Sequence, residues 1–393
     1  MRRVYDRLRL NFFLYPGIIR FRAADFLHPY YEWRKEQLGP ARIMLNALIF
    51  AWFWIWIPLR ARSAAKVWEK DASWRKHIIP LARRWMTDPF EFAIFDIGCE
   101  NDLRVIKRRM EQVPVIRTME SYGSDHREDL LDKEQFQRAC ENAGLRVPYL
   151  YAEIIEGRVH LRRSLPLEAT VLVKPTRGSG GRGIAVYPAK QFAQNCPLPS
   201  DLREGHWLVQ KHCTAHPTIV DLALDALPTL RITTILDERS IPEVVSTTLR
   251  YPARRGVAVD NGHAGGLIAP VSMEAGILGE GLSGWKPGRY PVHPETGGVI
   301  IGRQLPDWRA ALDLARDAHA KLFPEQVIVG WDIGVARDGP VLIEANQRPA
   351  VRLTQRAAGG GIGTMRYGEL LSWHLDRAVR MHPDRSMRFL SHG

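Results

Sequence analysis

A glycine-rich segment between two β-prone runs is the feature that most constrains how this chain can fold. Val171–Val173 and Ile184–Tyr187 favour strands, and four of the six residues from Gly178 to Gly183 are glycine. Their spacing, GxGxxG, matches the dinucleotide-binding fingerprint, which requires a helix directly after the loop. A β-branched, aromatic run and Pro188 follow instead, and the chain contains no GKS or GKT sequence. The segment therefore predicts a strand–loop–strand hairpin and excludes both a Rossmann turn and a Walker-type P-loop.

This hairpin is suited to fold over phosphate groups. Glycine lets the backbone approach a ligand closely, and successive N–H groups in such a loop bind anions. Lys174 ends the leading strand, so it can direct an ammonium group at the same anion. The alternative is a mobile surface hairpin without a ligand, which the neighbouring serine and lysine make the weaker interpretation. We predict that phosphate binds to Lys174, Gly178, Ser179, Gly180, Gly181 and Gly183.

A second lysine lies at the start of a predicted helix over residues 132–143. Asp132 can cap this helix, Gln135 completes a capping box, and Gly144 follows as a helix stop. Lys133 then falls in the first turn, where the helix dipole disfavours a positive charge. We interpret this placement as a sign that Lys133 contacts an anion. The alternative is an ordinary solvated lysine.

Oxygen ligands at metal spacing occur in the C-terminal half. Val327–Val335 is an apolar, strand-like run that contains Asp332, and Gly339 with Pro340 predicts a turn after it. On the returning strand Glu344 and Asn346 share one face, and the hairpin brings Asp332 near them. Two carboxylates and an amide oxygen suit Mg²⁺, and a cation between them relieves their repulsion. The alternative is a pair of strands whose acidic side chains face solvent.

Two other patterns point to ligand contacts. The run His206–Cys213 predicts a strand whose exit, at Gln210, can read a purine edge, although any strand end has this form. Arg231 and Arg250 lie inside β-prone runs, where an arginine binds an anion or makes a salt bridge on a solvent face. The polar, glycine-rich loop 260–266 is placed to contact a substrate.

Residues 1–90 differ in composition from the rest of the chain. They hold 17 Lys and Arg against 7 Asp and Glu, so most of the formal net charge of +12 lies there, as do 7 of the 12 Trp. Ile43–Leu59 is a 17-residue stretch in which Asn46 is the only strongly polar side chain. A bilayer span takes about 20 apolar residues, and both flanks are basic, so the positive-inside rule gives no orientation. We predict a helix that lies in or dips into the cytoplasmic leaflet; a span, a buried core helix and a helix covering a partner protein are the alternatives.

The composition of the whole chain is that of a globular protein. With 393 residues, 45% of them hydrophobic, it has material for two or three domains, and disordered, collagen-like and disulfide-scaffold classes are excluded. Its four cysteines form no CxxC pair, which predicts a reducing compartment and gives no support for a zinc or redox site. Because the body outside residues 1–90 is nearly neutral, we expect no nucleic-acid partner.

Taken in order, these motifs resemble the ATP-grasp superfamily. The wording TLRITT, the stretch from TTLRYP to DNGHAGG, and GWDIGV followed by GPVLIEANQRPA look closer still to its sugar-transfer-associated family, which is similar to α-L-glutamate ligase-like proteins. The resemblance covers roughly residues 120–355. It implies an α+β ATP-grasp fold of two α+β subdomains gripping ATP, preceded by a mainly helical N-terminal segment. We expect the limits to be 1–90 for the helical segment, 91–213 for the subdomain with flap and hinge, 214–380 for the subdomain with metal ligands, and 381–393 for a tail.

The resemblance also implies a role for each motif in nucleotide binding. Lys133 and Lys174 match two lysines that hold the ATP phosphates, and Gly178–Gly183 matches the flap over the triphosphate. The residues that match the adenine-binding hinge are Gln210, Lys211 and Cys213, and those that match ligands of one or two Mg²⁺ ions are Asp332, Glu344 and Asn346. The sequence departs from the family pattern where hinges carry an acidic ribose ligand: Pro217 stands there, and Asp221 is the substitute.

The remaining matches concern the second substrate and the reaction. Arg231 resembles a contact to the γ-phosphate or an acyl phosphate, and the acceptor-site candidates are Arg250, Asn261 and Arg348. The resemblance implies an ATP- and Mg²⁺-dependent ligase that forms an acyl phosphate from a carboxylate and joins it to an amine, in modification of surface polysaccharide or a lipid-linked sugar. The expected location is the cytoplasmic face of the membrane. An ATP-dependent phosphotransferase and a non-catalytic ATP-binding partner of polysaccharide assembly are the alternatives, and the oligomeric state stays open. All of these interpretations require that Lys174 and Glu344 border one cleft.

Overall fold

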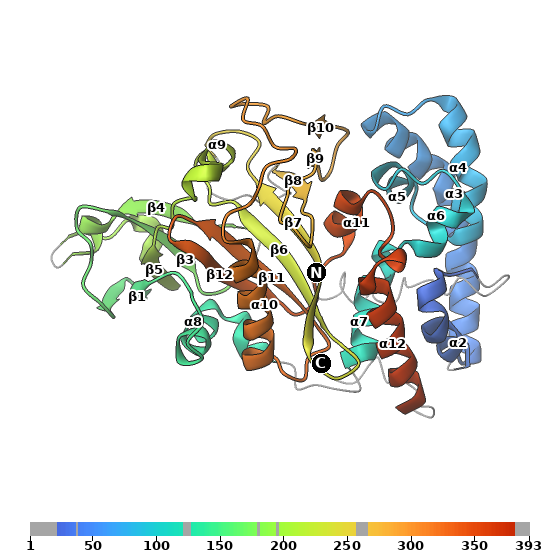
Figure 1. Cartoon of the computed structure of the whole chain (residues 1–393). Helices are drawn as coiled ribbons and strands as arrows, with labels where there is room; N and C mark the ends of the chain where they lie inside the picture. Colours follow the sequence, from blue (N-terminus) through green and yellow to red (C-terminus); the bar gives the residue numbers. More distant parts are fainter. Residues whose placement is uncertain are drawn as a thin grey trace.

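Two β-sheets organise the chain (Figure 1). The smaller has five strands in the order β2-β1-β5-β3-β4, and the larger has seven in the order β10-β9-β8-β7-β6-β11-β12. Neighbouring strands run antiparallel in both. The computed structural model describes residues 22–36, 38–120, 127–178, 181–193, 196–256 and 266–381. The strands are β1 (Leu150–Ile155), β2 (Arg158–Leu161), β3 (Thr170–Pro175), β4 (Ala185–Pro188), β5 (His206–Lys211), β6 (Thr229–Leu236), β7 (Pro242–Tyr251), β8 (Leu267–Pro270), β9 (Gly281–Ser283), β10 (Arg289–Tyr290), β11 (Ile328–Ala336) and β12 (Gly339–Asn346).

Helices surround the larger sheet and fill the N-terminal part of the chain. The α-helices are α2 (His28–Glu36), α3 (Pro40–Val67), α4 (Ala72–Trp85), α5 (Pro89–Ile94), α6 (Glu100–Val105), α7 (Gln112–Glu120), α8 (Lys133–Asn142), α9 (Val220–Ala223), α10 (Trp308–Leu322), α11 (Arg352–Ala358) and α12 (Arg366–Met381). The short 3₁₀ turns are η2 (Asp25–Leu27), η3 (Arg109–Glu111), η4 (Glu128–Leu131), η5 (Ala189–Phe192), η6 (Ser200–Leu202), η7 (Pro217–Ile219) and η9 (Ile362–Thr364). This mixture confirms the predicted α+β class with a helical N-terminal segment.

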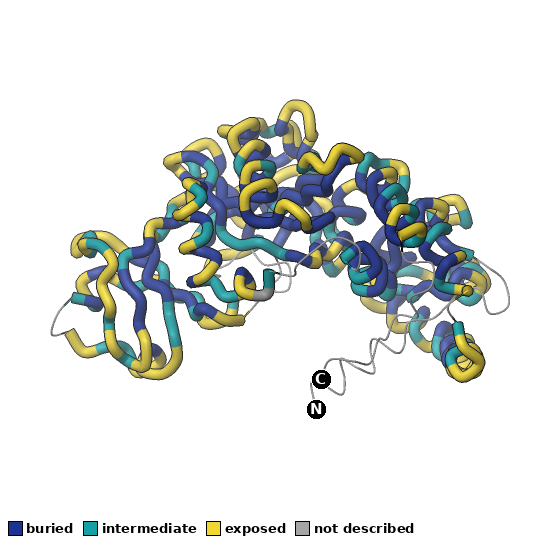
Figure 2. Tube along the Cα trace, turned by 90° about the horizontal axis from the view of Figure 1, so that it is seen from below, coloured by how far each residue is buried: buried dark blue, intermediate teal, exposed yellow. Residues whose placement is uncertain are grey.

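Both predicted hairpins are present. β3 pairs with β4 across the glycine-rich loop, with Val171 opposite Tyr187. β11 pairs with β12 across the predicted turn, with Asp332 opposite Glu344. All nine residues of β11 are buried, as the apolar run around Asp332 predicts. Figure 2 shows the buried segments running through the strands of both sheets, with exposed loops around them.

Helix α10 covers one face of the larger sheet. Alternate residues of β6, such as Leu230 and Ile232, share a core cluster with Trp308 and Leu312 of α10. Because side chains alternate along a strand, Arg231 lies on the opposite face. On that face Ile235 and Val245 belong to a second core cluster, which η2, α2, α7 and α12 complete. This cluster lies at the end of the larger sheet that is remote from the smaller sheet. The middle of this face, near Arg231, carries the polar side chains of Asp332 and Thr248.

The N-terminal helices form two kinds of contact. α3, α4 and α5 pack together in a cluster of their own, which includes Phe53, Ile57 and Trp85. α2 instead joins the second core cluster through Tyr30 and Tyr31, both fully buried against α12 and its neighbours. The core therefore joins residues on both sides of the predicted limit at residue 90.

Helix α8 begins where the capping pattern predicts. Asp132 Oδ1 accepts from the backbone N–H of Glu134 at 3.0 Å and lies 3.5 Å from that of Gln135. The Gln135 side chain donates to Glu134 Oε2 at 2.9 Å, so among the bonds of the described residues it does not close the predicted capping box. Gly144 stands after the helix in the left-handed region, at φ 67°, as the predicted stop requires.

Gln355 of α11 fastens the N-terminal helices to the sheet. Its side chain accepts from the backbone N–H of Lys107 at 2.8 Å and donates to the carbonyl of Lys107 at 3.0 Å. Both bonds are fully buried. A side-chain amide thus replaces the strand partner that this stretch of backbone lacks.

We predict that Gln355→Ala lowers the free energy of unfolding by about 2–4 kcal/mol, because it leaves a buried backbone donor and acceptor of Lys107 unpaired. Urea unfolding followed by circular dichroism measures this change. The matched control is Gln135→Ala, an exposed glutamine on α8, which should change the free energy by less than about 0.5 kcal/mol. Equal values for the two variants would contradict the fastening role.

Candidate functional site

A row of polar side chains crosses four strands of the larger sheet. Thr248 of β7 lies opposite Arg231 of β6, Arg231 opposite Asp332 of β11, and Asp332 opposite Glu344 of β12. Cross-strand partners have their side chains on the same face, and Asn346 shares the face of Glu344. The register therefore brings together the predicted metal ligands and the predicted phosphate-binding arginine, on the face that α10 does not cover.

Asp332 is held between two guanidinium groups. Arg231 Nε lies 2.5 Å from Asp332 Oδ1, and its Nη2 lies 3.1 Å from Oδ2. Arg250 Nη2 reaches Asp332 Oδ2 at 2.8 Å. Burial opposes ionisation of this carboxyl, but the two arginines outweigh it and hold its pKa at about 2. Asp332 is therefore ionised at neutral pH and fixes both arginines in place.

Glu344 lies in a different electrostatic situation. Burial raises the pKa of its carboxyl, and the neighbouring Asp332 carboxylate raises it further. Asn346 Nδ2 lies 3.4 Å from Glu344 Oε1. The two carboxylates and the amide thus form a set of hard oxygen donors in which a divalent cation would relieve like-charge repulsion. The set fits Mg²⁺, with the remaining ligands from phosphate and water.

No group of three or more His, Cys, Asp and Glu residues that could hold a metal by itself occurs in the described ranges. A site with only two carboxylates and an amide holds Mg²⁺ weakly without a ligand that shares the ion. This donor set is the kind that binds the metal together with a phosphate-bearing substrate.

Lys174 and Lys133 face this donor set from the smaller sheet and α8. Burial lowers the pKa of the Lys174 ammonium to about 8, an effect that Glu344 offsets and Lys133 reinforces. Lys133 in turn lowers the pKa of Glu344. The two lysines and Glu344 therefore lie within electrostatic reach of one another, where the smaller sheet and α8 meet the larger sheet.

The glycine-rich hairpin is hydrogen-bonded to Lys133. Lys133 Nζ donates to the carbonyl of Gly178 at 2.8 Å, and its backbone N–H donates to Thr176 at 2.9 Å. Gly178, Gly181 and Gly183 have φ angles of 122°, 73° and 77°. A residue with a side chain would be strained in this backbone conformation. Gly183 also lies against Trp207, where an added Cβ would come within 3.3 Å of the ring. Ser179 and Gly180, predicted to belong to this loop, lie outside the described residues.

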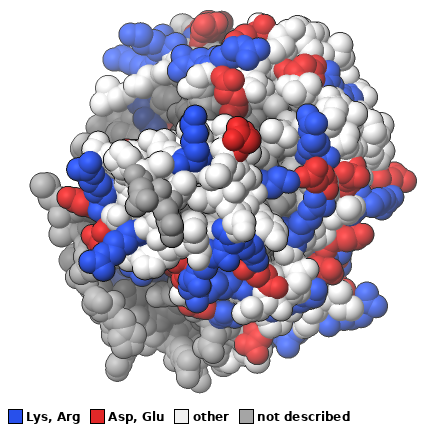
Figure 3. Space-filling view, turned by 90° about the vertical axis from the view of Figure 1, so that its left-hand side faces the viewer, with Lys and Arg blue, Asp and Glu red and all other residues white. Residues whose placement is uncertain are grey.

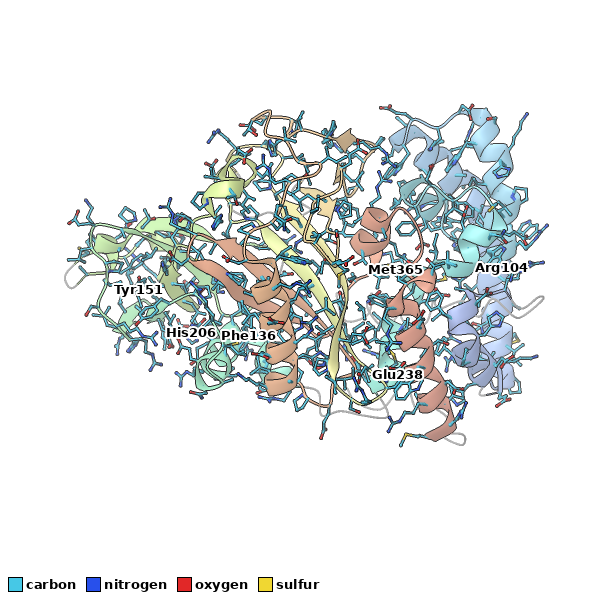
Figure 4. All side chains as sticks on the ribbon, viewed as in Figure 1. Arg104, Phe136, Tyr151, His206, Glu238 and Met365 are labelled. Carbon is cyan, nitrogen blue, oxygen red and sulfur yellow. The ribbon has the colours of Figure 1, made fainter. Side chains whose placement is uncertain are left out.

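The predicted hinge residues lie together at the end of β5. Gln210 is buried, and its Nε2 donates to Gln137 of α8 at 2.8 Å. Lys211 Nζ lies 2.6 Å from Asp338 Oδ2, in the turn between β11 and β12, so it ties the smaller sheet to the larger one. Cys213 Sγ lies 3.7 Å from the carbonyl of Lys211. Figure 4 shows Phe136 of α8 at the same end of the molecule as His206 and Tyr151 of the smaller sheet.

Three further predicted residues are not among the side chains described so far. Arg348 forms a two-point ion pair with Glu120 of α7, with both N–O distances 3.0 Å. Asp221, considered for the ribose, is bound by Arg303, whose Nη2 lies 2.7 Å from its Oδ2. Asn261, an acceptor-site candidate, lies outside the described residues.

Three polar residues of this face were not singled out from the sequence. Thr229 Oγ1 accepts from Arg250 Nη2 at 3.1 Å and helps to orient it. The hydroxyls of Ser246 and Thr248, both buried, have no hydrogen-bond partner in the described part of the chain. The signal was available, because Ser246, Thr248 and Arg250 alternate along one strand and so share a face.

The charges of the cleft do not cancel. Four cations, Lys133, Lys174, Arg231 and Arg250, stand against two acidic groups, Asp332 and Glu344. Figure 3 views the molecule from the end of the smaller sheet, and there Lys and Arg are interspersed with Asp and Glu. The positive excess among these six groups suits a polyanion that brings a divalent cation.

Comparison with known proteins identifies the family of this chain. The family model described as sugar-transfer associated ATP-grasp matches residues 118–366, more than half of the chain. A search of curated proteins finds no match.

Among solved structures, D-alanine–D-alanine ligase from Bacillus anthracis is 13% identical over 64% of this chain and 68% of that one, with a TM-score of 0.35. L-amino acid ligase from Bacillus licheniformis is 12% identical over 58% of this chain and 43% of that one, with a TM-score of 0.33. N5-carboxyaminoimidazole ribonucleotide synthetase from Thermotoga maritima is 10% identical over 57% of this chain and 43% of that one, with a TM-score of 0.30. The match thus spans less than half the length of the last two proteins.

We predict that Asp332→Asn lowers the free energy of unfolding by about 3 kcal/mol at neutral pH, because it removes the negative charge that pairs with two largely buried guanidinium groups. The folded state lowers the pKa of Asp332 to about 2, below that of an unfolded aspartate. The ionised Asp332 carboxylate therefore contributes fully to the free energy of unfolding above about pH 4, and this contribution is lost as the pH falls towards 2. Urea unfolding of both proteins between pH 2 and 7 should show the two stabilities converging in acid.

The control for this prediction is Asp313→Asn, which removes an exposed pair with Arg316 at 2.8 Å. That change should cost less than about 0.5 kcal/mol at neutral pH. A constant difference between wild type and Asp332→Asn over the whole pH range would mean that ionisation of Asp332 does not stabilise the fold.

Proposed function

The chain belongs to the sugar-transfer associated ATP-grasp family, and on this premise we propose that it is an ATP- and Mg²⁺-dependent ligase joining a carboxylate to an amine. The observation that carries the proposal is the convergence of Lys133 and Lys174 with Asp332 and Glu344 in one cleft. Two ammonium groups on one side and two carboxylates on the other are what a triphosphate with a divalent cation requires.

The smaller sheet and α8 hold the nucleotide in this proposal. Lys133 and Lys174 bind the phosphates, and the glycine-rich hairpin covers them with its backbone. The adenine lies against the strand end formed by Gln210, Lys211 and Cys213. The Gln137 amide fixes the side chain of Gln210, so the hinge presents a preformed edge to the base.

The larger sheet holds the metal and the transferred group. Asp332, Glu344 and Asn346 would bind Mg²⁺, in one or two ions, which when bound neutralises and orients the triphosphate. Arg231 and Arg250 are kept in place by Asp332, so they need no reorganisation to stabilise charge that develops on the transferred phosphoryl group. Arg250 and Thr248 lie beside Arg231 and border the position of the acceptor.

The reaction needs no covalent protein intermediate. A carboxylate oxygen of the acceptor attacks the γ-phosphorus, the bond between that phosphorus and the β–γ bridging oxygen breaks, and ADP leaves with an acyl phosphate formed. The amine nitrogen then attacks the acyl carbon, phosphate leaves with its C–O bond electrons, and the amine gives up a proton. The work of the chain is positioning and charge stabilisation.

The substrates are expected to be connected with sugars, as the family name indicates. A surface polysaccharide or its lipid-linked precursor would place the enzyme at the cytoplasmic face of a membrane. The basic, Trp-rich N-terminal segment supports this location, because residues 43–59 combine a long apolar stretch with basic flanks.

The first test of the proposal is ADP release with Mg²⁺ across amino acids and uronic-acid sugars. For an acceptor pair that gives ADP, we predict that oxygen-18 in the carboxylate appears in the released phosphate, since that oxygen attacks the γ-phosphorus. Mass spectrometry of the phosphate measures the transfer. ADP release without isotope transfer, accompanied by a phosphorylated product, would establish a phosphotransferase instead. A full screen without ADP would contradict catalysis of ligation.

We predict that Glu344→Gln lowers ADP release at least about 1,000-fold, because it removes the charged ligand that shares the metal with the nucleotide. Steady-state ADP release in excess Mg²⁺ measures the effect. Glu325→Gln, an exposed glutamate before β11, is the matched control and should retain wild-type turnover. Retention of full activity by Glu344→Gln would refute the metal assignment.

A further inference from the structure

Helix α3 has two different faces. One face is buried against α4 and α5 through Ile49, Phe53, Ile57 and Ala61, at helical spacing. The opposite face carries a stripe of apolar side chains that are each between 58% and 68% exposed: Met44, Leu48, Trp52, Ile55 and Leu59. Their spacing of three and four residues places them along one line. At 1.5 Å per residue the stripe is about 22 Å long.

This stripe is larger than an ordinary exposed apolar residue. Leu45 adjoins it and is 39% exposed, while Ile43 and Trp54, each also more than a third exposed, lie further around the helix. Soluble proteins rarely leave a continuous apolar surface of this kind without a ligand or partner. The helix is long and apolar enough to cross a membrane, but only 22% of its most apolar window is buried within the protein. The stripe therefore needs an apolar environment that the described chain does not provide.

Positive charge frames the stripe. Arg62 and Lys66 continue its line one and two turns beyond Leu59, and both are exposed. Arg83 of α4 stacks over the Trp54 ring at 4.5 Å and donates from Nε to the Trp54 carbonyl at 3.2 Å. No Asp or Glu occurs within α3. This arrangement suits the surface of a bilayer. The apolar side chains can enter the acyl-chain region, and the tryptophan and arginine side chains can contact the anionic headgroups.

The packing of α3 excludes a transmembrane orientation. α4 lies alongside α3 and carries Arg75, Lys76, His77, Arg83 and Arg84. If α3 crossed the bilayer, these charged side chains would enter the hydrocarbon, where charged groups are strongly disfavoured. Lying in the plane of the membrane, α3 inserts only its stripe and leaves α4 in water.

We propose that α3 binds the surface of an anionic bilayer in this orientation, with the stripe among the upper acyl chains and Arg83 at the headgroups. Arg62 and Lys66 lie on the line of the stripe, and their long side chains reach back to the headgroups. The proposal stands on the two faces of one helix and is independent of the ligase activity. In Figures 1 and 2 the N-terminal helices and the smaller sheet lie at opposite ends of the molecule. A membrane bound by α3 thus leaves the nucleotide-binding hairpin in solvent.

The test is flotation of the full chain with vesicles of phosphatidylcholine, with and without phosphatidylglycerol. We predict that the wild type floats with the anionic vesicles and that Leu48→Glu/Ile55→Glu lowers the bound fraction at least about tenfold. The matched control is Val299→Glu/Ile301→Glu, which changes two exposed apolar residues outside the N-terminal helices and should float like wild type. Circular dichroism and ADP release in solution check that each variant is folded.

A second variant tests the charges without touching the apolar stripe. Arg62→Glu/Lys66→Glu should lose the preference for anionic over neutral vesicles while the fold is retained. Wild-type protein that does not float, or equal flotation of Leu48→Glu/Ile55→Glu, overturns the proposal. So does a lipid-free dimer that the same double variant turns into a monomer, since the stripe is then covered by a second copy.

The orientation has its own measurement. After binding to preformed vesicles, an alkaline carbonate wash should release the protein, because an in-plane helix is held only by the stripe and by charge. Retention after the wash would show a spanning helix and overturn the in-plane orientation. Loss of vesicle binding with ADP release intact would refute this proposal alone, whereas loss of ADP release with binding intact would refute the proposed function alone.

Discussion

The pairing of the buried Asp332 carboxylate with two arginines is the interaction on which the candidate site depends. Two guanidinium groups on one uncovered sheet face would repel each other and bind any anion, but Asp332 pairs with both and fixes their orientation. Such a triad contributes little net stability, because taking three charges out of water costs about as much as their pairing returns. The role of the triad is to hold the two guanidinium groups in fixed positions. Arg231 and Arg250 are oriented without a substrate, with the strand of Asp332 between them and Glu344, and in the proposed function this orientation would suit a transferred phosphoryl group.

Contacts at the end of β5 tie the smaller sheet to α8 and to the larger sheet. Lys211 on β5 pairs with Asp338 in the turn between β11 and β12, and Gln210 is held by Gln137 on α8. The first bond ties the end of the smaller sheet to the larger one, and the second ties it to α8. Lys174 on β3 lies within electrostatic reach of Glu344 on β12. The proposed nucleotide site therefore needs both sheets and is not formed by either sheet alone.

Local patterns in the sequence are enough to identify half of this site, and long-range register supplies the rest. A helix cap marks Lys133, a strand end before four glycines marks Lys174, and an acid inside an apolar run marks Asp332. The pairing of Asp332 with Arg231 joins residues 101 positions apart, so no local pattern contains it. For the same reason Arg348 could not be matched from sequence to Glu120, 228 positions away. Composition likewise separates residues 1–90 from the body, yet it cannot show that Tyr30 and Tyr31 are buried in the core of that body.

The tie between the N-terminal helices and the sheet gives the proposed membrane contact a consequence for catalysis. Arg108 donates to the Tyr31 hydroxyl of α2 at 2.7 Å and to the carbonyl of Trp85 at the end of α4 at 2.6 Å, and both bonds are buried. One residue earlier, Gln355 holds the backbone of Lys107 against α11. α11 packs on β7 and β8, next to Arg250. A bilayer bound by α3 would therefore be held at a fixed position relative to the acceptor side of the cleft. An acceptor anchored in that bilayer would lose most of its translational freedom before it reached Arg250, and this loss is a main cost of bringing two substrates together.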